Sequence, residues 1–230
     1  MRHSGQLLFL CLVLSSGATG AVQGQDNQIS KRQIRVVIAP FYDWDGPKVE
    51  VGEYGKEIAA SDAKSIVSLS VNLKKQREKL KIETMYVLAI RLYDLGQKDE
   101  SVYWFYSAQY RAKVFAAVLD KKSIGGIGDH TYELTKAHIA FFVTSGMYIN
   151  GYAFGKLDML EQTILKVIDE GKKLPNFSAI YPTIKFIDSK TWQESNSENR
   201  SKLESLLEYI KKNRSLIKKQ RTENGIEEKF

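Results

Sequence analysis

The sequence has a single cysteine in 230 residues, and it lies where a mature protein would not keep it. Cys11 falls in the apolar part of an N-terminal segment, residues 1–24, that we expect to be removed as a secretory signal. Without that segment the chain has no thiol. This excludes a disulfide framework, a cysteine nucleophile and a thiolate metal site, so burial of apolar side chains must stabilise the fold.

The N-terminal segment has the three parts of a signal peptide. Arg2 and His3 form a short basic start, and Leu7–Leu14 is an apolar run. The run is shorter than the ~20 residues that span a bilayer. Small residues follow, and we expect cleavage before Ala21, with a second candidate site at Gly24. An exported protein without cysteines is typical of the bacterial periplasm, so we predict a periplasmic location.

Long hydrophobic runs and prolines are scarce in the rest of the chain. No apolar run after the leader is long and uncharged enough to span a membrane. The four prolines are at positions 40, 47, 175 and 182, and the interval between Pro47 and Pro175 is permissive for helices. Hydrophobic residues make up 43% of the sequence, which is enough for the core of one domain.

The predicted fold is mainly α, a helical bundle preceded by a short N-terminal β element. Residues 25–55 form the extended or β segment, with Gln33–Pro40 as its best strand candidate, and residues 56–230 form the helical domain. Apolar residues at spacings of three and four predict helices over residues 61–79, 82–95, 99–119, 129–152, 158–174 and 198–221. The helix over 129–152 is mostly apolar, so we expect it at the centre of the core, with Asp129 as its N-cap.

Histidine and the common catalytic motifs are also scarce. His130 and His138 are eight residues apart on a predicted helix, too far for a pair of metal ligands, and neither H-E-x-x-H nor G-x-S-x-G occurs. Gly125–Gly128 lacks the Lys-Ser/Thr of a phosphate loop. We predict no enzymatic activity, no cofactor and no metal site, and interpret His138 as a satisfied core histidine. A carboxylate pair from distant acids, such as Asp43 and Glu133, stays open.

One loop has an unusual composition. Phe41–Gly46 places Asp43 and Asp45 beside large rings, an arrangement that could face a sugar or a cation. A calcium loop of the helix-loop-helix kind needs further ligands at fixed offsets, and Pro47 interrupts that pattern. Turn formation by the two aspartates explains the string as well. We keep Asp43, Trp44 and Asp45 as candidate partner-binding residues.

The predicted helix over 99–119 carries an aromatic stripe. Tyr103, Tyr106 and Tyr110 recur at spacings of three and four, with Trp104 beside them. Aromatic side chains with a polar tip are common anchors of protein interfaces. The alternative is that the helix is sandwiched in the core and these side chains pack inside. We take the stripe as the candidate partner-binding surface.

Acidic residues are outnumbered, and the formal net charge is +7. Export argues against a nucleic-acid partner. The predicted C-terminal helix concentrates basic side chains, which could give a weak contact with an anionic surface or simply form a solvated face. These side chains are Lys202, Lys211, Lys212, Arg214, Lys218, Lys219 and Arg221.

One stretch resembles a known repeat. The tetratricopeptide pattern has an aromatic, Leu-Gly and a tyrosine on one helix, a turn glycine, and then small, phenylalanine and alanine positions on the next. Met85–Ala108 resembles a single hairpin of this kind, with Gly96 at the turn. The matching residues are Met85, Leu88, Ala89, Leu92, Ser101, Phe105 and Ala108. The closing proline of the pattern falls on Lys113, and no second copy follows. The resemblance implies protein or peptide binding rather than catalysis.

These observations predict an exported, non-enzymatic protein-binding module. Its build is similar to that of periplasmic immunity proteins, which bind and neutralise an antibacterial effector, so a secreted toxin is the expected partner. An envelope adaptor or scaffold is the first alternative. The second is a periplasmic hydrolase or sugar-binding protein that uses the Asp43–Asp45 loop.

Overall fold

The computed structural model describes residues 54–227, which belong to a unit spanning Gln33–Phe230. The predicted leader and the predicted β segment up to residue 53 lie outside the described residues. Within them the chain is mainly α, as predicted, and no strand occurs. The β pairing described there is one antiparallel bridge between Leu119 and Phe186.

The first part of the domain consists of short helices followed by a long hairpin. The helices are α1 (Gly55–Ala60), α2 (Ser65–Lys75), the 3-10 turn η4 (Arg77–Lys79), α3 (Ile82–Asp94) and α4 (Lys98–Val118). The predicted helix over 61–79 is therefore α2 followed by a separate turn. It starts late because the Asp62 carboxylate accepts a 2.7 Å hydrogen bond from the Ser65 backbone N–H and holds the chain in a turn.

The second part adds the helices that complete the bundle. After the turn η5 (Lys121–Ser123) come α5 (His130–Ala153), α6 (Leu157–Glu170), α7 (Phe177–Ile180), the turn η6 (Ser189–Thr191), α8 (Trp192–Lys212) and α9 (Arg214–Glu223). Asp129 is the N-cap of α5, as predicted, and its side chain accepts a 2.9 Å hydrogen bond from the Tyr132 N–H. No helix of the described part is long and apolar enough to cross a membrane.

The α3–α4 pair forms the predicted helical hairpin. Gly96 at its turn has φ +80°, a conformation that glycine adopts without strain. Ala89, Ser101 and Ala108 are fully buried between the helices. The Ser101 hydroxyl donates a 2.7 Å hydrogen bond to the Ala89 carbonyl, which shows how closely the two backbones approach. The small residues at these positions therefore let the two helices pack closely.

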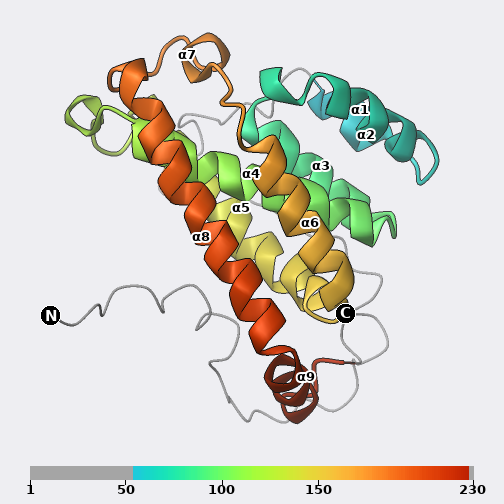
Figure 1. The fold of residues 1–230 in the computed structure, drawn as a ribbon. Helices are drawn as coiled ribbons and strands as arrows, with labels where there is room; N and C mark the ends of the chain where they lie inside the picture. Colours follow the sequence, from blue (N-terminus) through green and yellow to red (C-terminus); the bar gives the residue numbers. More distant parts are fainter. Residues whose placement is uncertain (1–53, 228–230) are drawn as a thin grey trace, which may run out of the picture. The chain divides into compact units, whose positions relative to one another are not determined.

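The central helix of the bundle is α4, and the prediction that residues 129–152 lie at the centre is wrong. Helices α3, α5, α6 and α8 all pack against α4, and Figure 1 shows α6 and α8 crossing in front of it. Most of α4 is buried because large aromatic and small residues alternate around its whole circumference. Helix α5 instead packs with one face and leaves Ile139, Val143 and Met147 exposed.

The C-terminal basic stretch also differs from the prediction. A single helix over 198–221 was expected, but α8 begins at Trp192 and ends before Asn213, where α9 starts in a new direction (Figure 1). The Asn213 side chain donates a 2.8 Å hydrogen bond to the Tyr209 carbonyl. Such local bonds compete with the regular helix ladder. Arg214 is held after the break by Asp158 at 2.5 Å and by Glu161, both on α6.

Candidate functional site

The aromatic stripe of α4 is inside the bundle and not on its surface. Tyr103, Trp104, Tyr106 and Tyr110 are all buried, with exposed fractions of 5%, 0%, 3% and 8%. The structure thus corrects the expectation of an aromatic partner surface and gives these side chains the alternative packing role. The reason is that α4 has neighbours on every side, which its own sequence cannot reveal.

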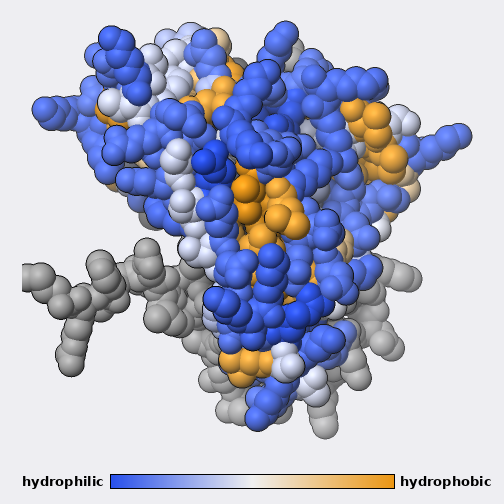
Figure 2. Space-filling model, in the orientation of Figure 1, coloured by the Kyte–Doolittle hydropathy of each residue, from blue (hydrophilic) through white to orange (hydrophobic). Residues whose placement is uncertain are grey.

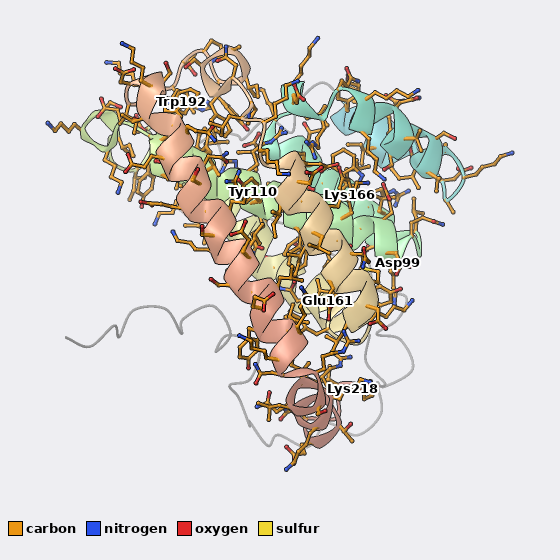
Figure 3. All side chains as sticks on the ribbon, in the orientation of Figure 1. Asp99, Tyr110, Glu161, Lys166, Trp192 and Lys218 are labelled. Atoms are coloured by element: carbon orange, nitrogen blue, oxygen red, sulfur yellow. The ribbon has the colours of Figure 1, made fainter. Side chains whose placement is uncertain are left out.

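The polar tips of these rings tie α4 to three other helices. The Trp104 indole N–H donates a 2.7 Å hydrogen bond to the Ser70 hydroxyl on α2. The Tyr103 hydroxyl lies 3.0 Å from the Glu170 carboxylate at the end of α6. The Tyr110 hydroxyl donates a 2.5 Å hydrogen bond to the Asn196 side-chain oxygen on α8, and Figure 3 shows Tyr110 between α6 and α8. Tyr103, Trp104 and Tyr110 therefore each satisfy their polar atom at a helix contact.

A small cavity with several polar side chains in its lining lies where α4, α6 and α8 meet. It measures about 30 Å³, and Arg77, Arg111, Tyr110 and Glu170 help to line it. Arg77 forms an ion pair with Glu170. The Arg111 guanidinium donates hydrogen bonds to the carbonyls of Arg77 and Leu80 at 2.7 and 3.0 Å, and burial lowers the pKa of Arg111 to about 10. A cavity of this size holds water rather than a substrate.

A second buried polar group joins α3, α5 and the segment after α7. Glu83, His138 and Tyr181 are buried, with exposed fractions of 0%, 6% and 3%. His138 Nε2 contacts Glu83 Oε1, and the Tyr181 hydroxyl donates a 3.2 Å hydrogen bond to Glu83 Oε2. The interpretation of His138 as a satisfied core histidine is confirmed. No sequence signal pointed to its partners Glu83 and Tyr181, because they are 55 and 43 positions away.

The residues with ligand chemistry do not converge on a metal site in the part of the chain that the structure describes. There, no group of three or more His, Cys, Asp and Glu side chains could hold a metal ion. Asp43, Trp44 and Asp45 lie outside the described residues, so the role predicted for that loop stays a prediction.

The outer face of α5 carries three exposed apolar side chains. Ile139, Val143 and Met147 are 52%, 55% and 61% exposed, and their spacing of four places them in one stripe along the helix. We call these three residues the α5 stripe. Residues 137–155 contain no Asp, Glu, Lys or Arg. Exposed apolar surface of this kind marks an interaction site more often than chance.

Other exposed apolar residues are more scattered. Val67 and Val71 lie one turn apart on α2, with exposed fractions of 39% and 50%, and Leu165 on α6 is 42% exposed. Figure 2 shows apolar surface between α6 and α8, surrounded by hydrophilic residues. Both helices also carry lysines and acidic residues along their lengths.

The basic residues of the C-terminal helices have mixed roles. Arg214 pairs with Asp158 and Glu161 on α6. Arg221 is buried and donates a 2.6 Å hydrogen bond to the Gly151 carbonyl, which holds α9 to α5. Lys202, Lys218 and Lys219 are exposed, and Figure 3 shows Lys218 on α9 at the end of the bundle. The predicted contact with an anionic surface therefore rests on the lysines and not on the arginines.

Comparison with known proteins gives one distant similarity. No protein-family model matches the chain, and no solved structure matches it. A protein of Haemophilus influenzae, named only as an uncharacterized protein, is 26% identical over 216 residues. The similarity covers 89% of this chain and 82% of the relative, so it extends over most of both proteins.

Proposed function

We propose that the protein is an exported, non-enzymatic binding module whose α5 stripe receives an apolar segment of a partner protein. The observation that carries the proposal is the stripe itself. Three large apolar side chains project from one helix face, and no charged residue occurs on that helix beyond Lys136. Covering apolar surface contributes about 25 cal/mol for each Å² removed from water.

The chemistry of the stripe defines the kind of partner that fits. An uncharged face cannot select a partner by ion pairing, so the matching segment must supply branched apolar side chains and few charges. The chain as a whole is basic, with a formal net charge of +7, so its surface has a net positive potential. Such a surface speeds the approach of an acidic partner without contributing to the apolar contact.

The cellular setting of the proposal is the bacterial envelope. The expected signal peptide supports export, and the similarity to a Haemophilus influenzae protein supports a bacterial origin. Neutralisation of an antibacterial effector is the finer proposal, in which a rigid helical face occludes the effector's active site. It predicts an effector gene beside this one, and cells that become sensitive to their siblings when this gene is deleted.

The experiment places a photo-crosslinking amino acid at Val143, in the middle of the stripe, and separately at Val71 on α2, an exposed valine of similar accessibility. Irradiation in intact cells should link one protein to position 143 and not to position 71. That protein, once purified, should bind the wild-type chain at least 10-fold more tightly than Val143→Asp, and Val71→Asp should bind like wild type. Equal binding to wild type and Val143→Asp would overturn the proposal.

A further inference from the structure

The cavity between α4, α6 and α8 carries one more positive charge than the carboxylates beside it neutralise. Its lining includes three cationic side chains, those of Arg77, Arg111 and Lys173. Glu170 forms an ion pair with Arg77, and Glu78 forms a 2.7 Å ion pair with Lys173. No ion pair joins Arg111 to a carboxylate of residues 54–227. One positive charge of the lining is therefore left without a counter-charge.

Arg111 is the most deeply buried of these three cations. Its exposed fraction is 6%, and its Nη1 donates hydrogen bonds to the carbonyls of Arg77 and Leu80. A guanidinium has five N–H donors, and neither Nε nor Nη2 donates a hydrogen bond to a residue of the described part. Burial, and after it repulsion by Arg77, lowers the pKa of Arg111 to about 10, so the group is still cationic at neutral pH. A buried charge without a partner is costly because it has lost its hydration.

We propose that this cavity binds one monovalent anion of the size of chloride, which neutralises Arg111 and joins α4 to α6 and α8. The site is separate from the α5 stripe, and the proposal goes beyond the proposed function.

A second donor accompanies Arg111 in the lining. The Ser107 hydroxyl, one turn earlier on α4, is buried and has no hydrogen bond of ordinary geometry to a described residue, and the Tyr103 hydroxyl is its polar neighbour. Tyr110 and Asn196 also line the cavity, but they are bonded to each other. The donors left for an anion are thus a guanidinium and a hydroxyl, and hydrogen bonds between ionised groups are the strong kind.

The size and charge of the cavity select the anion. Its volume is about 30 Å³, close to the ~30 Å³ that one water takes up in the liquid. A monatomic ion fits this space, and phosphate or an organic carboxylate does not. One unpaired positive charge also matches one negative charge. Glu170 does not oppose the anion strongly, because Arg77 neutralises it and the Tyr103 hydroxyl lies 3.0 Å from its carboxylate.

Thermal melts in sodium chloride and in sodium gluconate at equal ionic strength test the site, because gluconate is too large to enter. An anion that binds only the folded chain stabilises it in proportion to its occupancy, so wild type should melt at a higher temperature in chloride. Arg111→Met should weaken chloride binding about 10-fold or more, the loss expected for a charge-assisted hydrogen bond. The control Arg214→Met removes an arginine that pairs with Asp158 and Glu161, and should keep the chloride dependence of wild type.

A second variant should change the affinity in the opposite direction. Glu170→Gln leaves Arg77 without its carboxylate and adds a second unpaired positive charge to the cavity. Chloride should then bind more tightly than to wild type, although the variant itself is less stable. A role of Glu170 confined to packing would leave the chloride affinity unchanged.

Bromide gives a direct readout, because it resembles chloride and scatters X-rays anomalously. Crystals of the wild-type protein soaked in sodium bromide should show an anomalous peak beside Arg111 and Ser107. Lack of a peak there, equal chloride effects on wild type and Arg111→Met, or unchanged or weaker chloride binding by Glu170→Gln would each refute the proposal. If Arg111→Met does not fold, the bromide peak and Glu170→Gln decide between an anion and water.

Discussion

His138 on α5 contacts the carboxylate of Glu83 on α3, and both side chains are buried. Tyr181 completes the contact from the segment after α7, and its hydroxyl also accepts a 2.8 Å hydrogen bond from the Ile82 N–H. The rings of Phe115 on α4 and Tyr181 pack edge to face at 5.0 Å. One buried polar group thus joins segments from most of the length of the domain. Its loss should therefore lower the free energy of unfolding of the whole domain.

Removal of Glu83 should be costly. Glu83→Ala leaves His138 and Tyr181 without their shared partner, and breaking a buried polar pair in this way lowers the free energy of unfolding by about 3 kcal/mol. Urea denaturation followed by circular dichroism measures the change. Glu204→Ala, which removes an exposed carboxylate 3.8 Å from Arg200, should cost less than about 0.5 kcal/mol. Equal effects of the two substitutions would contradict the structure.

The Tyr110 hydroxyl should contribute to stability and the Tyr106 hydroxyl should not. Tyr110→Phe removes the 2.5 Å hydrogen bond to Asn196 and should lower the free energy of unfolding by about 1 kcal/mol. Tyr106 is equally buried, but the structure shows no hydrogen bond from it to a described residue, so Tyr106→Phe should be close to neutral. Thermal melts of both variants provide the comparison. A larger loss of stability for Tyr106→Phe than for Tyr110→Phe would refute the role given to the Tyr110 hydroxyl.

Lys113 on α4 should make stability depend on pH. Burial lowers the pKa of Lys113 to about 8 from its ordinary 10.5. Between these values the unfolded chain keeps a proton that the folded chain has lost, so the free energy of unfolding should rise with pH from about 8 to 10. Lys113→Met should abolish this rise and stabilise the protein at pH 7. Urea titrations at pH 7, 8.5 and 10 measure it, with the exposed Lys64→Met as the control that keeps the rise.

Gly96 should tolerate alanine less well than Gly126. It has φ +80°, where a side chain is strained even though no atom lies within 4 Å of an added Cβ. Gly96→Ala should therefore lower the free energy of unfolding by about 1 kcal/mol. Gly126 has equal space but no positive φ, so Gly126→Ala should be neutral or slightly stabilising. Similar melting temperatures for the two variants would be inconsistent with the turn at Gly96.

Local sequence patterns predicted the positions of the helices well. They did not predict which helix faces are buried and which are exposed. The spacing of Leu88, Leu92 and Phe105 predicted the α3–α4 hairpin. A helix can be predicted in this way because its period appears as spacings of three and four residues in the sequence. The same reasoning placed Tyr106 and Tyr110 at a partner surface and residues 129–152 at the centre. Both errors have one cause: a local pattern shows that a face is apolar but not whether another helix covers it.

The sequence by itself determined the helical class, the turn at Gly96, the cap at Asp129 and the lack of a disulfide framework, because each depends on residues a few positions apart or on composition. Only the tertiary structure decided that α4 is the central helix, that Glu83 is the partner of His138, and that Ile139, Val143 and Met147 face outward. These features depend on contacts between segments distant in the chain, and the energy of such contacts depends on packing that no local pattern records.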